Sequence, residues 1–166
     1  MVESENFALQ GPGAPVRCSA PMRDAMVLLV EENPVEATLA CAALALQPDV
    51  AVLAVSDVPA AIDLLKRQGG QGSVTLAILG RHAIERGAGR LVKELSRQGT
   101  DVPVIGIAGE VRAAERARAL EAGVSAFYDR PHGWNAYSAL MAKVLAEWRV
   151  TRTPSDASLE QVWNGV

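Results

Sequence analysis

The stretch VTLAILGRHAIERGAG, residues 74–89, decides the fold of this chain. It opens with a continuous apolar run, which ends at Gly80 and is followed by polar sequence that contains further glycines. Such a run is typical of a strand buried on both faces of a parallel sheet. In folds of this kind, binding sites lie just beyond the carboxyl ends of the strands. We therefore expect Gly80 at the tip of a central strand, where it offers no side chain to a pocket.

The same alternation of strand and helix continues on both sides of this stretch. Apolar runs predict strands over residues 25–30, 50–55, 74–79, 102–108 and 125–128. Caps, prolines and glycines predict helices over residues 34–47, 57–69, 89–98, 110–122 and 132–149. Either Ser56 or Asp57 is expected to cap the second helix. Five such units with short connections predict an α/β fold, a doubly wound five-stranded parallel sheet with helices on both faces.

Three parts of the chain differ in composition. Residues 1–23 are rich in Gly and Pro with little periodicity, which predicts a flexible leader. Residues 24–150 hold the predicted strands and helices and form the expected folded domain. Residues 151–166 are polar apart from three apolar residues at helical spacing, so this tail is expected either to be disordered or to form a short docking helix.

Charge and composition limit the kinds of partner. The chain has 166 residues, a net charge of −3 and a pI near 5.4, so it has no basic surplus for binding a nucleic-acid backbone. Its start lacks the basic and apolar parts of a signal peptide, and no apolar run is long enough to span a membrane. Cys18 and Cys41 lie in different environments and are expected to be reduced thiols. We expect a cytoplasmic protein that binds neither nucleic acid nor membrane.

The last predicted helix carries an aromatic and aliphatic stripe. Its members recur at spacings of three, four and seven, which predicts a face packed on the core. They are Trp134, Tyr137, Met141, Val144, Leu145 and Trp148. Leu140 falls off this stripe and is expected to be exposed.

The turn after the first strand, EENP at residues 31–34, differs from the known phosphate-binding turns. It has no glycines to cradle a pyrophosphate, and the chain contains no P-loop. It offers instead two carboxylates, Glu31 and Glu32, which suit a divalent cation or a basic side chain. No arrangement of Ser, His and Asp or of Cys and His is evident, so we expect no enzymatic activity.

Three segments carry a resemblance to a known family. These are MVLLVEENP at 26–34, PVIGIAG at 103–109 and GVSAFYDRP at 123–131. In this order they resemble the first strand with its acidic pair, the fourth strand, and the fifth strand with its Lys-Pro turn, of the receiver domains of bacterial two-component response regulators. The resemblance covers about residues 24–150 and implies the flavodoxin-like receiver topology.

The resemblance also implies which residues occupy the family's phosphorylation site. Gly80 falls on the position of the phosphoacceptor Asp, and glycine cannot be phosphorylated. Ala108 falls on the hydroxyl residue of the fourth strand, and Arg130 on the lysine of the fifth. Phe127 falls on the aromatic switch position and keeps a ring without a polar group. Only the acidic pair remains, so the resemblance implies a degenerate receiver pocket.

The remaining acidic pair predicts little metal affinity. The family holds Mg²⁺ with three carboxylates, whereas this chain offers two, each one methylene longer than Asp. Because Mg²⁺ demands tight octahedral geometry, we expect no metal site and no cofactor. Arg130 is expected either to pair with Glu31 or Glu32 or to point into solvent.

The resemblance implies a module that signals through protein–protein interaction without phosphorylation. Its expected partners are a histidine kinase, a phosphotransfer protein or another regulator, and it is also compatible with a homodimer. In the family the partner face lies on the fourth helix, fifth strand and fifth helix, and the corresponding residues are Arg112, Arg116, Arg118, Phe127 and Leu140. The competing interpretation of the arginines is an ordinary solvated helix face.

Two alternatives from other functional classes remain open. Arg81 and His82, together with Arg130, are candidates for a cationic mouth that senses a small anion or ligand. Asp129 is a candidate for a displaced phosphoacceptor in a working receiver.

Overall fold

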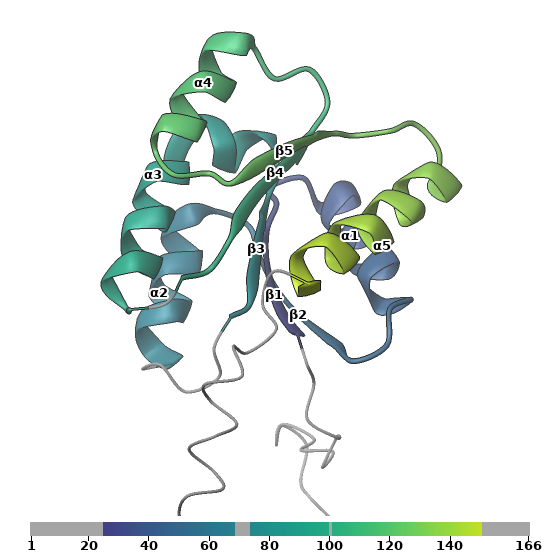
Figure 1. The fold of residues 1–166 in the computed structure, drawn as a ribbon, viewed down its shortest axis with the longest axis horizontal. Coiled ribbons are helices and arrows are strands. Elements are labelled where there is room, and N and C mark those ends of the chain that lie inside the picture. The colour runs from purple at the N-terminus through teal and green to yellow at the C-terminus, as the bar shows by residue number, and fades with distance from the viewer. Residues whose placement is uncertain (1–24, 69–73, 100, 151–166) are drawn as a thin grey trace, which may run out of the picture.

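The computed structural model describes residues 25–68, 74–99 and 101–150, in which five strands alternate with five helices (Figure 1). The strands are β1 (Ala25–Val30), β2 (Val50–Val55), β3 (Leu76–Leu79), β4 (Val104–Ala108) and β5 (Ala126–Asp129). The helices are α1 (Pro34–Ala45), α2 (Val58–Gln68), α3 (Arg81–Arg97), α4 (Ala113–Glu121) and α5 (Trp134–Val150). The predicted leader and tail lie outside the described residues.

All strand pairs are parallel, and the strand order is β2-β1-β3-β4-β5. The order changes direction between β1 and β3, where Val30 pairs with Leu79. Helices α1 and α5 cover one face of the sheet, and α2, α3 and α4 cover the other (Figure 1). The predicted doubly wound five-stranded sheet is thus confirmed.

The core has two layers because the central strands are buried on both faces. Along β1, Leu28 and Val30 belong to the layer under α2, α3 and α4, whereas Val27 and Leu29 belong to the layer under α1 and α5. This alternation follows from the period of two in a strand. It explains why β1 is a continuous apolar run and why such runs located the strands in the sequence.

The apolar stripe of α5 packs as predicted except at its first residue. Tyr137, Met141, Val144 and Leu145 are buried, and Trp148 packs against the same layer. Trp134, the first residue of α5, is 42% exposed. The prediction that the neighbouring Leu140 is exposed is also wrong: it is half-buried against the layer under α1 and α5.

The largest error in the predicted elements concerns α3. This helix begins at Arg81, directly after β3, and not at Gly89. Gly80 is its N-cap residue, and the Ile84 amide donates to the Gly80 carbonyl at 3.1 Å. Arg81 and His82 therefore lie in the first turn of a helix and not in a loop. The glycines that suggested a loop are accommodated inside the helix.

Smaller differences occur at other boundaries. Strand β4 begins after Pro103, which has no amide hydrogen for the sheet. Helix α4 begins at Ala113, because Glu110 has a φ of 48° and cannot belong to a helix. At the start of α2, Asp57 is the cap: its Oδ1 accepts from the Ala60 amide at 2.8 Å.

The fold also bears on the cysteines and on the absence of a membrane-spanning segment expected from the sequence. Cys41 is a free, half-buried thiol on α1, and Cys18 lies outside the described residues. Within those residues, every helix is too short or too polar to cross a membrane.

Candidate functional site

The residues predicted to form the pocket gather at the carboxyl edge of the sheet. Glu31 follows β1, Gly80 follows β3, Ala108 ends β4 and Arg130 follows β5. At this edge a pocket of about 520 Å³ is lined by residues of α1, α3 and the loops after β4 and β5. Its lining residues are Glu36, Arg81, Ala108, Gly109, Glu110, Arg130, Pro131, His132 and Gly133. The pocket brings together Arg81, Ala108 and Arg130 of the predicted set, whereas its lining does not include Glu31, Glu32, Gly80 or His82.

The carboxylate of Glu31 occupies the space beside Gly80. A Cβ atom placed on Gly80 would lie 2.6 Å from Cδ of Glu31 and closer still to Oε2. Gly80 has ordinary extended dihedral angles, so the glycine is required by this contact and not by its backbone conformation. The other carboxylate oxygen of Glu31, Oε1, accepts a hydrogen bond from the Asn33 amide at 2.9 Å. A side chain at position 80 and this Glu31 conformer exclude each other.

Burial raises the pKa of the Glu31 carboxyl above that of an ordinary glutamate. The hydrogen bond from the Asn33 amide opposes this rise and is the next largest influence on the pKa. Glu36 raises the pKa further, whereas Arg130 and His82 lower it. Removal of the carboxylate from water is therefore the dominant effect at this position.

Arg130 takes neither of its two predicted arrangements. Its guanidinium forms an ion pair with Glu36 in the first turn of α1 and lies 5.4 Å from the centre of the Tyr137 ring. The side chain is only 23% exposed. Burial raises the pKa of Tyr137 to about 12, so this ring stays neutral beneath the guanidinium. Arg130 thus ties the turn after β5 to α1 and α5.

The cations of the predicted anion mouth each have a carboxylate nearby. Arg81 donates from Nε to Glu85 at 2.9 Å within α3, and Nδ1 of His82 lies 3.6 Å from Glu32. Arg130 is paired as described above. An incoming anion would have to compete with these carboxylates, so the arrangement does not favour anion binding.

Three residues of this edge were missed by the sequence reasoning. Glu36 and Tyr137 contact Arg130, and Asn33 both caps α1 and fixes Glu31. The turn at Asn33-Pro34 was a readable helix start. The contacts of Glu36 and Tyr137 with Arg130 join segments far apart in the chain, and no local pattern indicates them. In the described part of the chain, no group of three or more His, Cys, Asp or Glu side chains is placed to hold a metal ion.

Solved structures with the same arrangement are response regulators. The phosphorylated cyanobacterial phytochrome response regulator RcpA is 17% identical, with a TM-score of 0.63 over 79% of this chain and 99% of that chain. HP1043, an orphan response regulator of H. pylori, is 17% identical, with a TM-score of 0.60 over 77% and 99%. The Mn²⁺-bound form of response regulator Rcp1 is 17% identical, with a TM-score of 0.62 over 78% and 97%. This chain has the receiver fold.

The likeness to these proteins is one of fold. No protein-family model matches the sequence, and no curated protein is similar to it at a significant level. The receiver fold and its strand order are the properties that the comparison establishes, in agreement with the resemblance read from the sequence.

The face that α4, β5 and α5 present in the receiver fold holds part of the predicted partner surface. Arg116 donates from Nη2 to Asp129 at 2.8 Å and lies 5.5 Å from the centre of the Phe127 ring. That ring packs over Gly106, where a Cβ atom would lie 2.6 Å from it. Exposed Arg112 precedes the same helix. Arg116, Phe127 and Asp129 form one connected patch, which we call the α4–β5 patch.

Two residues predicted for this face lie elsewhere in the receiver fold. Arg118 lines a groove between α3 and α4, on the other side of α4. Leu140 contributes to the layer under α1 and α5. Both predictions relied only on the element in which each residue lies. The helical period of 3.6 residues turns each of the two side chains away from the face formed by α4, β5 and α5.

Proposed function

We propose that the chain is a phosphorylation-independent receiver-like module of bacterial two-component signalling. In this proposal it acts in the cytoplasm by binding other signalling proteins and has no enzymatic activity of its own. The observation that carries the proposal is the contact between the Glu31 carboxylate and Gly80. The position that resembles the phosphoacceptor has no nucleophilic side chain, and its space is already filled.

The surrounding residues support the same conclusion. Ala108 has no hydroxyl group with which to bind a phosphoryl oxygen, and the positive charge of Arg130 is neutralised by Glu36. Two of the neighbours are described as a phosphorylated form and a Mn²⁺-bound form, and these are properties of those proteins. In this chain the carboxylates of the degenerate pocket are engaged with its own side chains and amides.

The α4–β5 patch supports action through protein binding. Arg116 and Asp129 are 38% and 83% exposed, so the patch offers both charges and an aromatic edge to a partner. Expected partners are a histidine kinase, a phosphotransfer protein or another regulator, and a second copy of the chain is an alternative occupant.

The first experiment tests phosphorylation. The chain is incubated with a small-molecule phosphodonor and Mg²⁺ and analysed by intact mass spectrometry, with a phosphorylatable receiver domain treated in parallel. We expect the mass of this chain to remain unchanged while the control gains a phosphoryl group. A gain that disappears in the Asp129→Asn variant would overturn the proposal and establish the displaced acceptor.

The second experiment tests protein binding. The chain is used as bait in lysate of its source organism, and the retained proteins are identified by mass spectrometry. We expect two-component signalling proteins that are lost with the Arg116→Ala variant and kept with Arg67→Ala, an exposed cation on α2. Retention of no signalling protein, or of the same proteins by both variants, would contradict the assigned face.

A further inference from the structure

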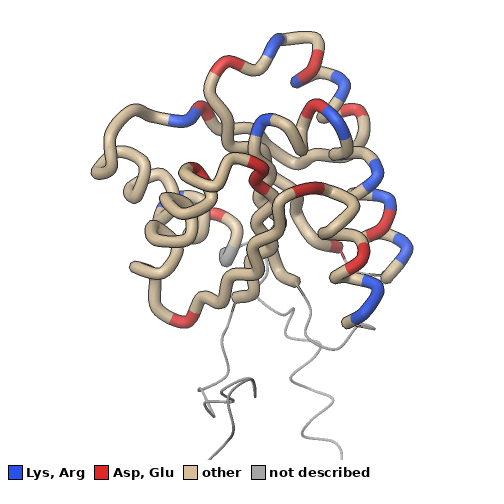
Figure 2. Tube along the Cα trace, turned by 180° about the vertical axis from the view of Figure 1, so that it is seen from behind, with Lys and Arg blue, Asp and Glu red and all other residues tan. Residues whose placement is uncertain are grey.

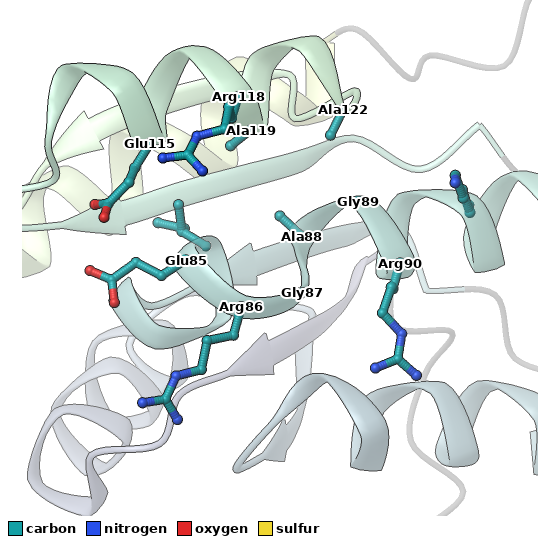
Figure 3. A pocket seen from close by; sticks show the side chains of 12 residues that line it. Glu85, Arg86, Gly87, Ala88, Gly89, Arg90, Glu115, Arg118, Ala119 and Ala122 are labelled. Carbon is teal, nitrogen blue, oxygen red and sulfur yellow. The ribbon is translucent and has the colours of Figure 1, made fainter.

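A groove runs between α3 and α4 on the side of the molecule away from α1 and α5 (Figures 1 and 3). Its volume is about 540 Å³. Figure 3 shows Ala88 on α3, Ala119 on α4 and Ala122 directly after α4 facing the gap between the two helices. The groove is therefore lined at its base by the smallest side chains.

Close packing explains why these residues are small. A Cβ atom on Gly89 would lie 3.3 Å from Cβ of Ala122, which is tighter than most such contacts. At the end of α4, Gly123 has a φ of 108°, and a Cβ atom there would lie 2.7 Å from Val92 on α3. Because the two helices approach closely through small residues, the surface above them is a shallow channel that can accept the ridge of another helix.

The α3 rim of the groove carries a row of cations. Arg86, Arg90 and Lys93 follow one another at i, i+4 and i+7, so they lie along one side of the helix over about 10 Å. All three are exposed, and within the described residues none of them forms an ion pair. We call these three residues the α3 row.

The other arginines of α3 differ from the row. Arg81 pairs with Glu85 at 2.9 Å, and Arg97 pairs with Glu94 at 3.0 Å. In the described part of the chain the cations near the two ends of α3 are thus paired, whereas the three in the middle form no ion pair. The hydrogen bond from Arg81 lowers the pKa of the Glu85 carboxyl, and Arg86 is close enough to Glu85 to lower it further.

The positive charge of the α3 row is opposite in sign to the net charge of the whole chain. The chain has a net charge of −3, and α1 on the opposite face contains neither Lys nor Arg. Figure 2 shows the Lys and Arg positions concentrated along the side of the molecule that carries α2, α3 and α4. The positive groove is therefore a local feature and not the result of an overall basic composition.

We propose that the α3–α4 groove binds an acidic helix of a partner protein, with the carboxylates of that helix facing the α3 row. A small anion would require donors that converge on one point, whereas Figure 3 shows Arg86 and Arg90 extending in parallel from α3 on the side away from α4, and Arg118 extending from α4. A row at helical spacing complements carboxylates at the same spacing on a helix laid along the groove.

The acidic residues of the groove determine how the partner helix would be oriented along it. Glu85 and Glu115 lie together at one end, whereas Arg90 lies further along α3 (Figure 3). Lys93 follows Arg90 by about one turn of the helix. The acidic part of the partner helix is therefore expected over the second half of α3, and a neutral or basic part over the glutamates.

This inference rests on the proposed function only in that both have the chain act by binding proteins. The groove lies on the opposite side of α4 from the α4–β5 patch, so the two surfaces can be tested separately. Failure of the groove would leave the binding lost with Arg116→Ala unchanged. The proposed function would fail if the chain became phosphorylated or if it retained no signalling protein. Neither result would affect the groove test.

The test is fluorescence anisotropy with a labelled alanine-based peptide of about 20 residues, long enough to be substantially helical in water. The peptide carries glutamates at i, i+4 and i+7 on one face. Three further probes are used: the same peptide with glutamines, a peptide with the glutamates distributed around the helix, and a random-sequence DNA duplex. The full chain is compared with the triple variant R86Q/R90Q/K93Q.

A control variant, K66Q/R67Q/K143Q, removes the same charge from exposed positions outside the groove. A second variant, Ala122→Tyr, fills the groove at an exposed position without changing the charge. Because the charged positions are exposed, both triple variants are expected to keep the circular dichroism spectrum and the urea unfolding midpoint of the original chain. Ala122 faces Gly89 closely, so the binding result of Ala122→Tyr is interpreted only if its circular dichroism spectrum and unfolding midpoint match those of the original chain.

We expect the acidic-face peptide to bind the original chain and the control variant, and to lose about tenfold or more in affinity with R86Q/R90Q/K93Q. Ala122→Tyr should weaken binding as well, because the tyrosine ring would occupy the groove in which the peptide helix lies. Equal binding of the redistributed peptide would overturn the helical occupant. Tighter binding of DNA, no binding of any probe, or equal affinity of both triple variants would overturn the proposal.

Discussion

The Glu31 carboxylate fills the space that a side chain at position 80 would occupy. The sequence identified the glycine and the acidic pair, but it did not indicate their contact. A contact between the residues that follow β1 and β3 depends on the register of the two strands, and local sequence patterns do not encode that register. The sequence therefore located both residues at the ends of their strands but did not indicate that they touch.

The first prediction concerns the size of the residue at position 80. Gly80→Ala should lower the free energy of unfolding by about 1–3 kcal/mol, because its Cβ atom would overlap the Glu31 carboxylate. In the Glu31→Ala background the cost should shrink to that of replacing the N-cap glycine of α3 by alanine, because the overlap is gone and the backbone conformation suits any residue. Urea unfolding of the four variants of this double-mutant cycle measures the coupling. Equal costs in both backgrounds would show that the overlap is relieved elsewhere.

The second prediction follows from the raised pKa of Glu31. The folded chain binds the carboxyl proton more tightly than the unfolded chain, whose glutamate pKa is 4.5. The stability gained from protonated Glu31 is therefore present below pH 4.5 and is lost as the pH rises through the folded-state pKa. Glu31→Gln keeps this side chain uncharged at every pH and can still accept from the Asn33 amide. Its stability relative to the original chain should thus increase with pH.

Urea unfolding of both chains at about pH 4 and about pH 7 tests this dependence. The Glu31→Gln variant should be the more stable of the two at the higher pH, and the difference should shrink at the lower pH. A difference that is constant, or that grows as the pH falls, would show that the carboxylate form is favoured in the folded chain.

At the scale of the elements, the continuous apolar strands were predictable and the start of α3 was not. Strands β1 and β2 have the predicted bounds, because residues buried on both faces leave an unbroken apolar run. Helix α3 begins with polar residues and contains Gly87 and Gly89, which local propensity assigns to a loop. Packing between helices overrides that propensity, since both glycines lie where a neighbouring helix approaches.

The third prediction tests this explanation at Gly87. A Cβ atom there would lie 2.9 Å from Cβ and Cγ2 of Val58 on α2. Gly87→Ala should therefore destabilise the chain, although alanine favours a helix interior by about 1 kcal/mol over glycine. In the Val58→Ala background, which removes the two obstructing methyl groups and keeps Cβ, the cost of Gly87→Ala should be smaller than in the original chain. Thermal unfolding followed by circular dichroism compares these variants, and a stabilising Gly87→Ala alone would contradict the packing explanation.

At the scale of the whole molecule, the sequence indicated the architecture but not the distribution of charge over its faces. The order of strands and helices was sufficient for the doubly wound sheet, because few topologies satisfy short, right-handed crossovers. The concentration of cations on α2, α3 and α4 becomes visible only when the elements are placed around the sheet. The same is true of Arg118, which the fold assigns to the α3–α4 groove.

The fourth prediction concerns the extent of the folded unit. Both layers of the core lie between Ala25 and Leu145. A chain trimmed to residues 24–150 should therefore unfold in a single transition, at the same urea midpoint as the full chain and within about 0.5 kcal/mol of its stability. Urea titrations followed by circular dichroism and by tryptophan fluorescence test both points. A clearly lower midpoint would show that residues outside this range contribute to the fold.

The mutual exclusion at Gly80 and Glu31 also restricts the order in which this sequence can change from one generation to the next. A mutation that introduces Asp at position 80 meets the glutamate and carries a cost, whereas the same mutation is tolerated once position 31 has become smaller. A lineage that carries both residues can therefore gain an aspartate at position 80 most readily through two substitutions in a preferred order. The glycine is in this sense held in place by a neighbour that follows another strand.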